Sequence, residues 1–431
     1  MLAAIGANTV EELFEVVPVA LRFPELHLPP PASEADLMRE LRGISGRNTD
    51  VLHSRSFLGA GAYNHFVPSA VDAILRRAEF YTSYTPYQPE LAQGTLQAIF
   101  EYQTLLCALT GMDAANASHY DGATALAEAA IMALTSTRNR RTILVAPTVH
   151  PQYRETLRTY TQGLAVKITG DQDPGVTPQA LAQQVDTSTA AIIVQTPDFL
   201  GQMHDLRPIA EAAHAAGALL IASIDPIALG LFQNPGAAGA DIVTAEGQPL
   251  GIPMSFGGPL LGIFACKEQY LRRMPGRLVG ATTDMNGDVG YVLTLQTREQ
   301  HIRREKATSN ICTNQGLMAL AATVYMSLLG KQGFRQVAEV CYQRAHYAAA
   351  ELAKLPGYDV LTPDPFFKEF ALRTPRPAAE INAALRKQDI IGGYDLKQDY
   401  PHLGDALLLC VTEMNTRSDI DILVDALRNF A

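Results

Sequence analysis

Between residues 116 and 265 the sequence alternates between continuous apolar segments and amphipathic segments, and this pattern restricts the fold more than any other feature. Helices are expected at 123–137, 177–184 and 206–216. Apolar, β-branched runs predict strands at 142–147, 165–170, 190–197, 218–225, 241–247 and 260–266. Strands that are apolar along their whole length suit a mostly parallel sheet buried on both faces. The sequence therefore predicts a doubly wound α/β domain, with its ligand site beyond the carboxyl ends of the strands.

We expect three parts in the 431-residue chain, since a domain typically takes about 150 residues. Residues 1–55 form an N-terminal helical arm. Residues 56–330 form the large α/β domain, including a long helix that ends at Gly111. Residues 331–431 form a small C-terminal α/β domain.

Composition excludes several classes of protein. There are 34 Lys and Arg against 44 Asp and Glu, and the resulting net charge of −10 argues against nucleic-acid binding. Only 18% of residues are charged, below the typical value of about 25%, which favours a large subunit interface. The five cysteines form no CxxC pair, so no metal site and no disulfide framework is expected. No apolar run approaches the ~18 residues of a membrane span, and the N-terminus lacks a signal peptide's basic region. We expect a cytoplasmic protein.

Four residues at the predicted ends of strands and at a helix start suggest a cofactor pocket. Asp121 and Thr124 flank the start of the helix at 123–137, where free backbone N–H groups favour a phosphate. His150 and Asp225 follow two strands at the same edge of the sheet. A phosphate cradle, an aromatic ring and an Asp for a pyridinium nitrogen are what a pyridoxal phosphate site needs. The alternative is that Asp121 only caps its helix.

The lysine that such a site requires is missing from its expected place. It should follow the strand at 241–247, where the chain reads Gly247, Gln248, Pro249. Gln248 has no amine with which to form a Schiff base, so no covalently bound cofactor is expected on this chain. Lys267 is the nearest alternative, at a solvated position after the next strand.

Two further segments have unusual compositions. The loop "YTSYTPYQPE" at 81–90 contains Tyr84, Thr85, Tyr87 and Gln88, and aromatic residues in such loops are typical of interfaces; alternatively, its tyrosines pack on the first helix. In an otherwise acidic chain, a basic segment is followed by polar residues; together they comprise Arg298, His301, Arg303, Arg304, Lys306, Thr308, Ser309 and Asn310. This segment either meets a phosphate or an acidic partner, or is a solvated helix face balanced by acidic neighbours.

Long motifs across nearly the whole chain resemble one family. They are "SFLGAGAYNHFVP" (56–68), "YTSYTPYQPELAQGTLQAIFEYQTLLCALTGMDAANAS" (81–118), "DGATALAEA" (121–129), "EGQPLGIPMSFGGP" (246–259), "MPGRLVG" (274–280) and "LQTREQHIRREKATSNICT" (295–313). The chain resembles glycine decarboxylase, the P-protein of the glycine cleavage system, and specifically its N-terminal half, which in many bacteria and archaea is a separate subunit 1. The family's catalytic half has a lysine where this chain has Gln248.

The resemblance implies a pyridoxal phosphate-dependent transferase of fold type I, similar to aspartate aminotransferase. It implies that the cofactor lies on a homologous subunit 2, in a heterotetramer of two of each chain. Glycine would be decarboxylated there, with release of CO2 and transfer of the aminomethyl group to the lipoyl arm of H-protein. This chain would supply one wall of the partner's active site, and its own pocket would be vestigial. The wall residues would be Tyr84, Thr85, Tyr87 and Gln88 in the loop, and Thr308, Ser309 and Asn310 after the basic residues.

Two other functions remain open from the sequence. One is a self-sufficient pyridoxal phosphate enzyme that works as a homodimer, which Gln248 disfavours. The other is a structural or regulatory subunit that stabilises its partner. Substitution of Tyr87 or Asn310 distinguishes this second case from a chain that contributes to the active site.

Overall fold

A seven-stranded, mostly parallel sheet runs through the computed structural model, which describes residues 1–137, 140–312 and 314–430. Thr313 and Ala431, the last residues of the 295–313 motif and of the expected small domain, lie outside the described residues. Contacts divide the chain into two units, Met1–Asp50 and Val51–Ala431. The first unit contains the short helices η1 (Leu2–Ile5), η2 (Glu11–Phe14) and η3 (Val19–Leu21), and the helix α1 (Glu34–Ser45). None of the residues in these four helices is buried.

The main sheet of the second unit has the strand order β2-β8-β7-β6-β5-β3-β4. Its strands are β2 (Ala114–Ala115), β3 (Thr142–Val145), β4 (Lys167–Thr169), β5 (Thr189–Thr196), β6 (Leu219–Ile224), β7 (Ile242–Glu246) and β8 (Gly262–Cys266). Strands β4, β3, β5, β6 and β7 run parallel, and β8 pairs antiparallel with both β7 and β2. All six strands expected between 142 and 266 are present, which confirms the mostly parallel sheet of an α/β fold.

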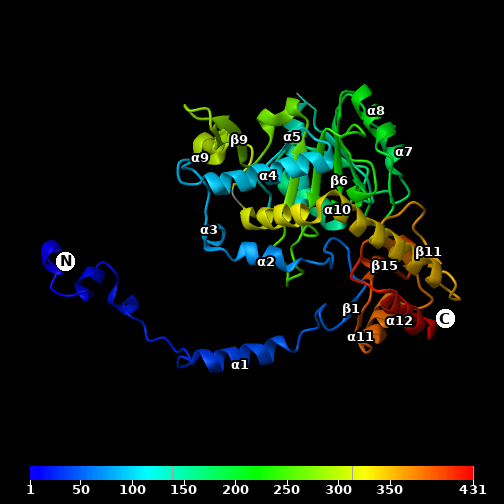
Figure 1. Cartoon of the computed structure of the whole chain (residues 1–431), viewed down its shortest axis with the longest axis horizontal. Helices are drawn as coiled ribbons and strands as arrows, with labels where there is room; N and C mark the ends of the chain where they lie inside the picture. Colours follow the sequence, from blue (N-terminus) through cyan, green and yellow to red (C-terminus); the bar gives the residue numbers. More distant parts are fainter. Residues whose placement is uncertain (138–139, 313, 431) are drawn as a thin grey trace. The chain divides into compact units, whose positions relative to one another are not determined.

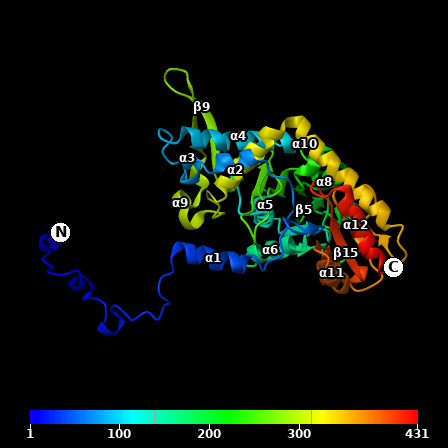
Figure 2. The same cartoon turned by 60° about the horizontal axis from the view of Figure 1, so that its bottom comes forward.

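Helices cover this sheet and connect its strands. Helix α5 (Gly122–Ser136) contacts β5, β6, β7 and β8, while α8 (Arg207–Ala215) contacts β6. The other helices are α2 (Ser69–Leu75), α3 (Ala78–Tyr81), α4 (Gln93–Thr110), α6 (Pro151–Thr161), α7 (Pro178–Ala182), α9 (Gln300–Arg303), α10 (Gly316–Leu352), α11 (Ala378–Arg386) and α12 (Arg417–Arg428). Helices α4 and α10 pack side by side (Figures 1 and 2). As expected, α4 ends at Gly111, whose φ of 71° is left-handed.

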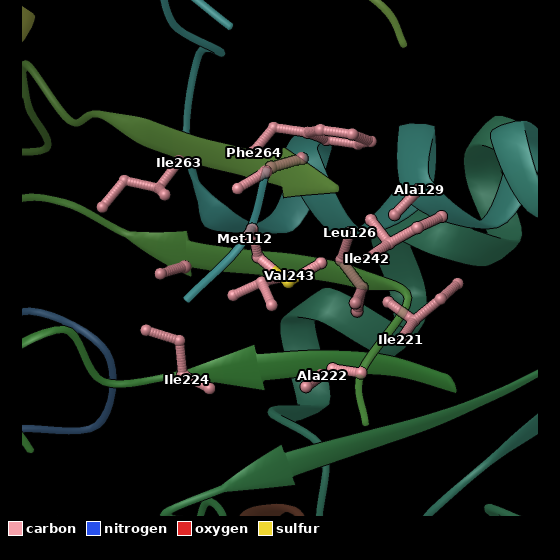
Figure 3. Packing of buried hydrophobic residues seen from close by; sticks show 14 of the residues in the cluster. Met112, Leu126, Ala129, Ile221, Ala222, Ile224, Ile242, Val243, Ile263 and Phe264 are labelled. Atoms are coloured by element: carbon pink, nitrogen blue, oxygen red, sulfur yellow. The ribbon is translucent and has the colours of Figure 1, made fainter. Parts of the chain in front are cut away.

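The main core lies between α5 and the sheet. Leu126 and Ala129 of α5 meet Ile221 and Ile242 from β6 and β7, with Phe264 of β8 nearby (Figure 3). These side chains are fully buried or nearly so, because strands of this sheet are covered on both faces. Dense packing of this kind fixes where each strand ends and therefore where the residues beyond those ends lie.

A four-stranded antiparallel sheet forms near the C-terminus in the order β11-β12-β15-β14. Its strands are β11 (Asp359–Val360), β12 (Glu369–Arg373), β14 (Tyr394–Asp395) and β15 (Ala406–Cys410). The remaining strands pair as β1 (Arg55–Ser56) with β13 (Ile390–Ile391) and as a hairpin of β9 (Leu278–Thr283) and β10 (Val289–Thr294). The division into domains 56–330 and 331–431 stays a prediction; α10 crosses that boundary, and Gly330 interrupts its helical geometry there. Among the described residues, helices that combine the length and apolarity of a membrane span are absent.

Candidate functional site

One small cavity lies where the parallel strands end. Its lining includes His150 after β3, Gln195 on β5, Asp225 after β6 and Glu246 at the end of β7. The structure thus brings His150 and Asp225 together at the sheet edge that the sequence predicts. The cavity volume is only about 30 Å3, room for one or two water molecules, whereas ligand pockets usually measure about 300–1,000 Å3.

A lysine that the sequence analysis gave no role occupies the acidic end of this pocket. Lys368, just before β12, places its Nζ 2.7 Å from Oδ2 of Asp225, and its side chain is only 1% exposed. The same Nζ lies 3.6 Å from the centre of the Tyr63 ring. Burial lowers the pKa of Lys368, but the Asp225 carboxylate, together with Cys410 and Cys341, raises it above its usual value. Asp225 is therefore already neutralised by a cation of this chain.

Behind Lys368 the polar chain continues through a neutral histidine. Burial, together with the Lys368 charge, lowers the pKa of His65. Neutral His65 accepts a hydrogen bond from Lys368 Nζ at Nε2 (3.0 Å), while its Nδ1 donates to Glu413 Oε2 (2.8 Å). Burial raises the pKa of Glu413, but hydrogen bonds from His65 and the Phe66 N–H hold it at about 2. Each charged group in this series, Asp225, Lys368 and Glu413, thus has a partner, as burial requires.

The helix start that the sequence proposes as a phosphate cradle is occupied by carboxylates of the chain. Asp121 caps α5 by accepting the Thr124 N–H at 2.7 Å, and Thr124 completes a capping box. The Gly122 N–H donates instead to Glu246 Oε2 at 3.0 Å. Glu246 also accepts the N–H groups of Gln248 and Leu261. Burial raises the pKa of Glu246 to about 7 in spite of these donors.

Gln248, at the position of the missing lysine, also forms hydrogen bonds within the chain. The Gln248 amide accepts the Tyr63 N–H at 2.9 Å and donates to the carbonyls of Tyr63 (3.0 Å) and Ile252 (2.8 Å). His150, the expected stacking ring, stacks on Tyr153 with 4.6 Å between ring centres, and its Nε2 lies 2.9 Å from the Ala60 carbonyl. The residues of this pocket therefore do not fit pyridoxal phosphate: its ring, phosphate and lysine positions are all taken by the chain's own groups.

The tyrosine loop presents a different surface. Tyr84 is 77% exposed and lines a cavity of about 290 Å3 together with Asn314 and Leu317. Tyr87 and Gln88 are also exposed, whereas Thr85 is buried. Tyr84 and Tyr87 thus do not pack entirely within this chain, which leaves aromatic area for a partner.

The polar segment after the basic residues lies on a second open surface. Thr308, Ser309 and Asn310 line a cavity of about 370 Å3 with Glu128 of α5. Burial raises the pKa of Glu128 to about 7, although its hydrogen bond with Ser309 opposes the rise. The buried Glu128 carboxyl, which is readily protonated, therefore contacts the 308–310 segment through Ser309.

The basic segment is not one solvated helix. It folds into η6 (Gln296–Arg298), α9 and η7 (Arg304–Lys306). Arg298 is half-buried and donates to the carbonyls of Met274 and Gly276. Burial, and then the nearby Arg277, lower the pKa of Arg298 to about 10. His301, Arg303, Arg304 and Lys306 are exposed. The segment therefore combines one anchoring arginine, Arg298, with exposed cations at Arg303, Arg304 and Lys306, while His301 contacts Tyr87 and Arg277.

Several residues of these sites carry no sequence signal of their own. Lys368, Glu246 and His65 complete the filled pocket, and Arg277 contacts the tyrosine loop. Glu246, His65 and Arg277 lie in motifs that the sequence analysis had singled out, and Lys368 lies outside them, but no pattern in those motifs indicated these contacts. The pairings join positions more than a hundred residues apart, so local periodicity does not reveal them.

The fold places the chain in the class of pyridoxal phosphate-dependent transferases of fold type I. An Escherichia coli cysteine desulfurase superposes with a TM-score of 0.64 over 90% of this chain and 97% of that chain, at 15% identity, which shows the shared fold alone. A crystal structure of the glycine decarboxylase (P-protein) of the glycine cleavage system, in inhibitor-bound form, is far more similar. Its TM-score is 0.94 at 44% identity, covering 100% of this chain and 97% of that one.

Sequence comparison then gives the family. The model of the glycine cleavage system P-protein matches residues 1–427, and the chain belongs to this family. A Thermomicrobium roseum protein named probable glycine dehydrogenase (decarboxylating) subunit 1 is 58% identical, over 99% of this chain and 96% of its own length. A Desulforamulus reducens protein of the same name is 54% identical, over 98% and 95%.

Proposed function

We propose that this chain is subunit 1 of a glycine dehydrogenase (decarboxylating), an oxidoreductase that acts as a heteromeric complex. Its partner is a homologous, lysine-bearing subunit 2, in a heterotetramer of two of each chain. The observation that carries the assignment of the cofactor to the partner is the filled pocket, where Lys368 neutralises Asp225 and Glu246 takes the start of α5. On the partner, pyridoxal phosphate supplies the electron sink for decarboxylation.

The overall reaction balances with a lipoyl disulfide on H-protein as the acceptor. Glycine loses its carboxylate as CO2, and the electron pair that remains on carbon forms a C–S bond. The S–S bond breaks, and the second sulfur takes a proton. A reaction of this kind needs a site closed to water, because a carbanion equivalent is readily protonated.

The chain's own contribution is one wall of that site. Tyr84 and Tyr87 expose aromatic faces that exclude water when the partner covers them. Thr308, Ser309 and Asn310, from a separate sequence motif, present hydroxyl and amide groups suited to orient a carboxylate or a phosphate oxygen. Thr85, which is buried, holds the loop from inside, and Gln88 lies on its outer face.

The basic segment divides into two proposed roles. Arg298 orders the interface by bonding two backbone carbonyls. Arg303, Arg304 and Lys306 are exposed cations that attract an acidic lipoyl carrier through a screened field, and His301 lies beside them with a pKa that burial and Arg277 lower.

The test is reconstitution of the two chains. Each is purified alone and together, and glycine–bicarbonate carbon exchange is measured with H-protein and with free lipoate. We expect exchange only in the mixture, and a heteromeric complex in sedimentation. Exchange by this chain alone, or a phosphopyridoxyl-lysine in it after borohydride reduction, would establish the self-sufficient enzyme instead.

A purely structural role is tested on the wall. Asn310→Ala should lower the exchange rate while assembly is unchanged. Asn429→Ala, which removes an amide at the end of α12, is the matched control and should leave the rate intact. Equal rates for both variants would favour the structural subunit.

A further inference from the structure

Arg277 has a buried guanidinium that no catalytic assignment uses. It precedes β9, and its side chain is 4% exposed. It forms an ion pair with Glu299, which is equally buried. Its own carbonyl accepts the Ala117 N–H at 2.9 Å. Two residues further on, the side-chain amide of Gln103 on α4 accepts the Val279 N–H and donates to the Val279 carbonyl. The backbone from which Arg277 extends is therefore fixed to the main sheet and to α4.

The guanidinium itself reaches two parts of the proposed wall. Nη2 donates to the Tyr87 hydroxyl at 2.7 Å and to Cys312 Sγ at 3.0 Å. Nη1 lies 3.2 Å from Nδ1 of His301. The Arg277 guanidinium carbon also lies 5.3 Å from the centre of the Tyr87 ring, whose edge meets His301. One side chain thus joins the tyrosine loop to the segment that contains Thr308, Ser309 and Asn310.

This set of contacts requires an arginine. A guanidinium offers five donors in a rigid planar fork, so it bonds to a carboxylate, a phenol and a thiol in different directions at once. A lysine keeps the charge for Glu299 but not the fixed geometry. Burial strengthens each bond, because the surrounding dielectric is low.

We propose that Arg277 is a positioning residue, which holds Tyr87 and the 308–312 segment in one arrangement so that the wall forms as a unit. The inference rests on the proposed function, since the wall serves the partner's site. Both Nη groups of Arg277 are engaged by Tyr87, Cys312 and Glu299, so Arg277 acts through these side chains and not on the reacting groups.

The experiment is a double-mutant cycle in the two-chain complex. Arg277→Lys and Tyr87→Phe should each lower kcat about ten- to a hundredfold, the worth of a charge-assisted hydrogen bond. KM for glycine should change less than about threefold, because orientation rather than binding is lost. The double variant should be no slower than the slower single variant, since both remove the same contact.

Arg207→Lys is the matched control, because Arg207 forms an exposed ion pair with Asp205 on the surface. It should retain the wild-type rate. Where Arg277→Lys does not assemble, Arg277→Met/Glu299→Gln replaces it in the cycle, since it removes both buried charges together.

The outcomes separate the two proposals. If the wild-type complex does not act on glycine, the proposed function is wrong, and the positioning role of Arg277 is wrong with it. If the wild type is active, a normal kcat for Arg277→Lys, or rate losses that multiply in the double variant, overturns the positioning role alone.

Discussion

Replacement of Lys368 by methionine tests whether the pocket is held together by its own charges. Methionine keeps the unbranched stem but removes the ammonium group that lies 2.7 Å from Asp225. Asp225 would then be a buried carboxylate that still accepts a hydrogen bond from the Ile227 N–H at 2.9 Å but has lost its cation. His65 would also lose the donor to its Nε2.

The size of the effect follows from the burial of both partners. Removal of one member of a buried ion pair costs about 3–5 kcal/mol, because the other charge stays uncompensated. Lys368→Met should lower the free energy of unfolding by this amount. Lys368→Met/Asp225→Asn should recover most of it, since asparagine keeps the acceptor for Ile227 and leaves no charge.

The assay is urea unfolding of the two-chain complex by circular dichroism, at one protein concentration, because partner binding shifts apparent stability. Lys354→Met is the matched control: its partner is Glu351 on the surface of α10, and a surface pair contributes at most about 1 kcal/mol. If Lys368→Met unfolds like this control, or if the double variant is less stable than the single one, the ion pair does not hold the pocket and the reasoning is wrong.

Three further predictions concern the pocket, the wall and the basic surface. Gln248→Lys should not attach pyridoxal phosphate, because Lys368 still fills the pocket; a phosphopyridoxyl-lysine found by mass spectrometry after borohydride reduction would contradict this. The pKa of Glu128 rises from 4.5 to about 7 on folding, so the folded state binds the proton more tightly. Its stabilising contribution is complete below about pH 4.5 and is lost by about pH 7, and wild type should lose on the order of 3 kcal/mol relative to Glu128→Gln over that range in denaturation curves; parallel curves would refute the shift. Reversal of both Arg303 and Arg304 to Glu should slow exchange with H-protein and flatten its ionic-strength dependence, with assembly intact and free lipoate unaffected; equal loss with lipoate would mean that these cations order the site instead.

The fold was predictable because its signals are local. The long strands of the sheet are continuous apolar runs. A capping residue such as Gly111, which follows α4, marks the end of a helix within a few residues. Helix α6 and the β9–β10 hairpin were not anticipated. Most of α6 is polar, and the hairpin alternates only weakly, so both elements depend on packing against α5 and α4 respectively.

The sequence by itself shows that Gln248, which has no amine, stands at the strand end where a cofactor lysine is expected. It also determined the family and the composition of the two proposed wall segments. Only the tertiary structure decided what fills the pocket and what joins the wall. Lys368 is 143 positions from Asp225, and Arg277 is 190 from Tyr87. Such pairings arise when packed strands bring distant side chains to the same place, and no local pattern records that convergence.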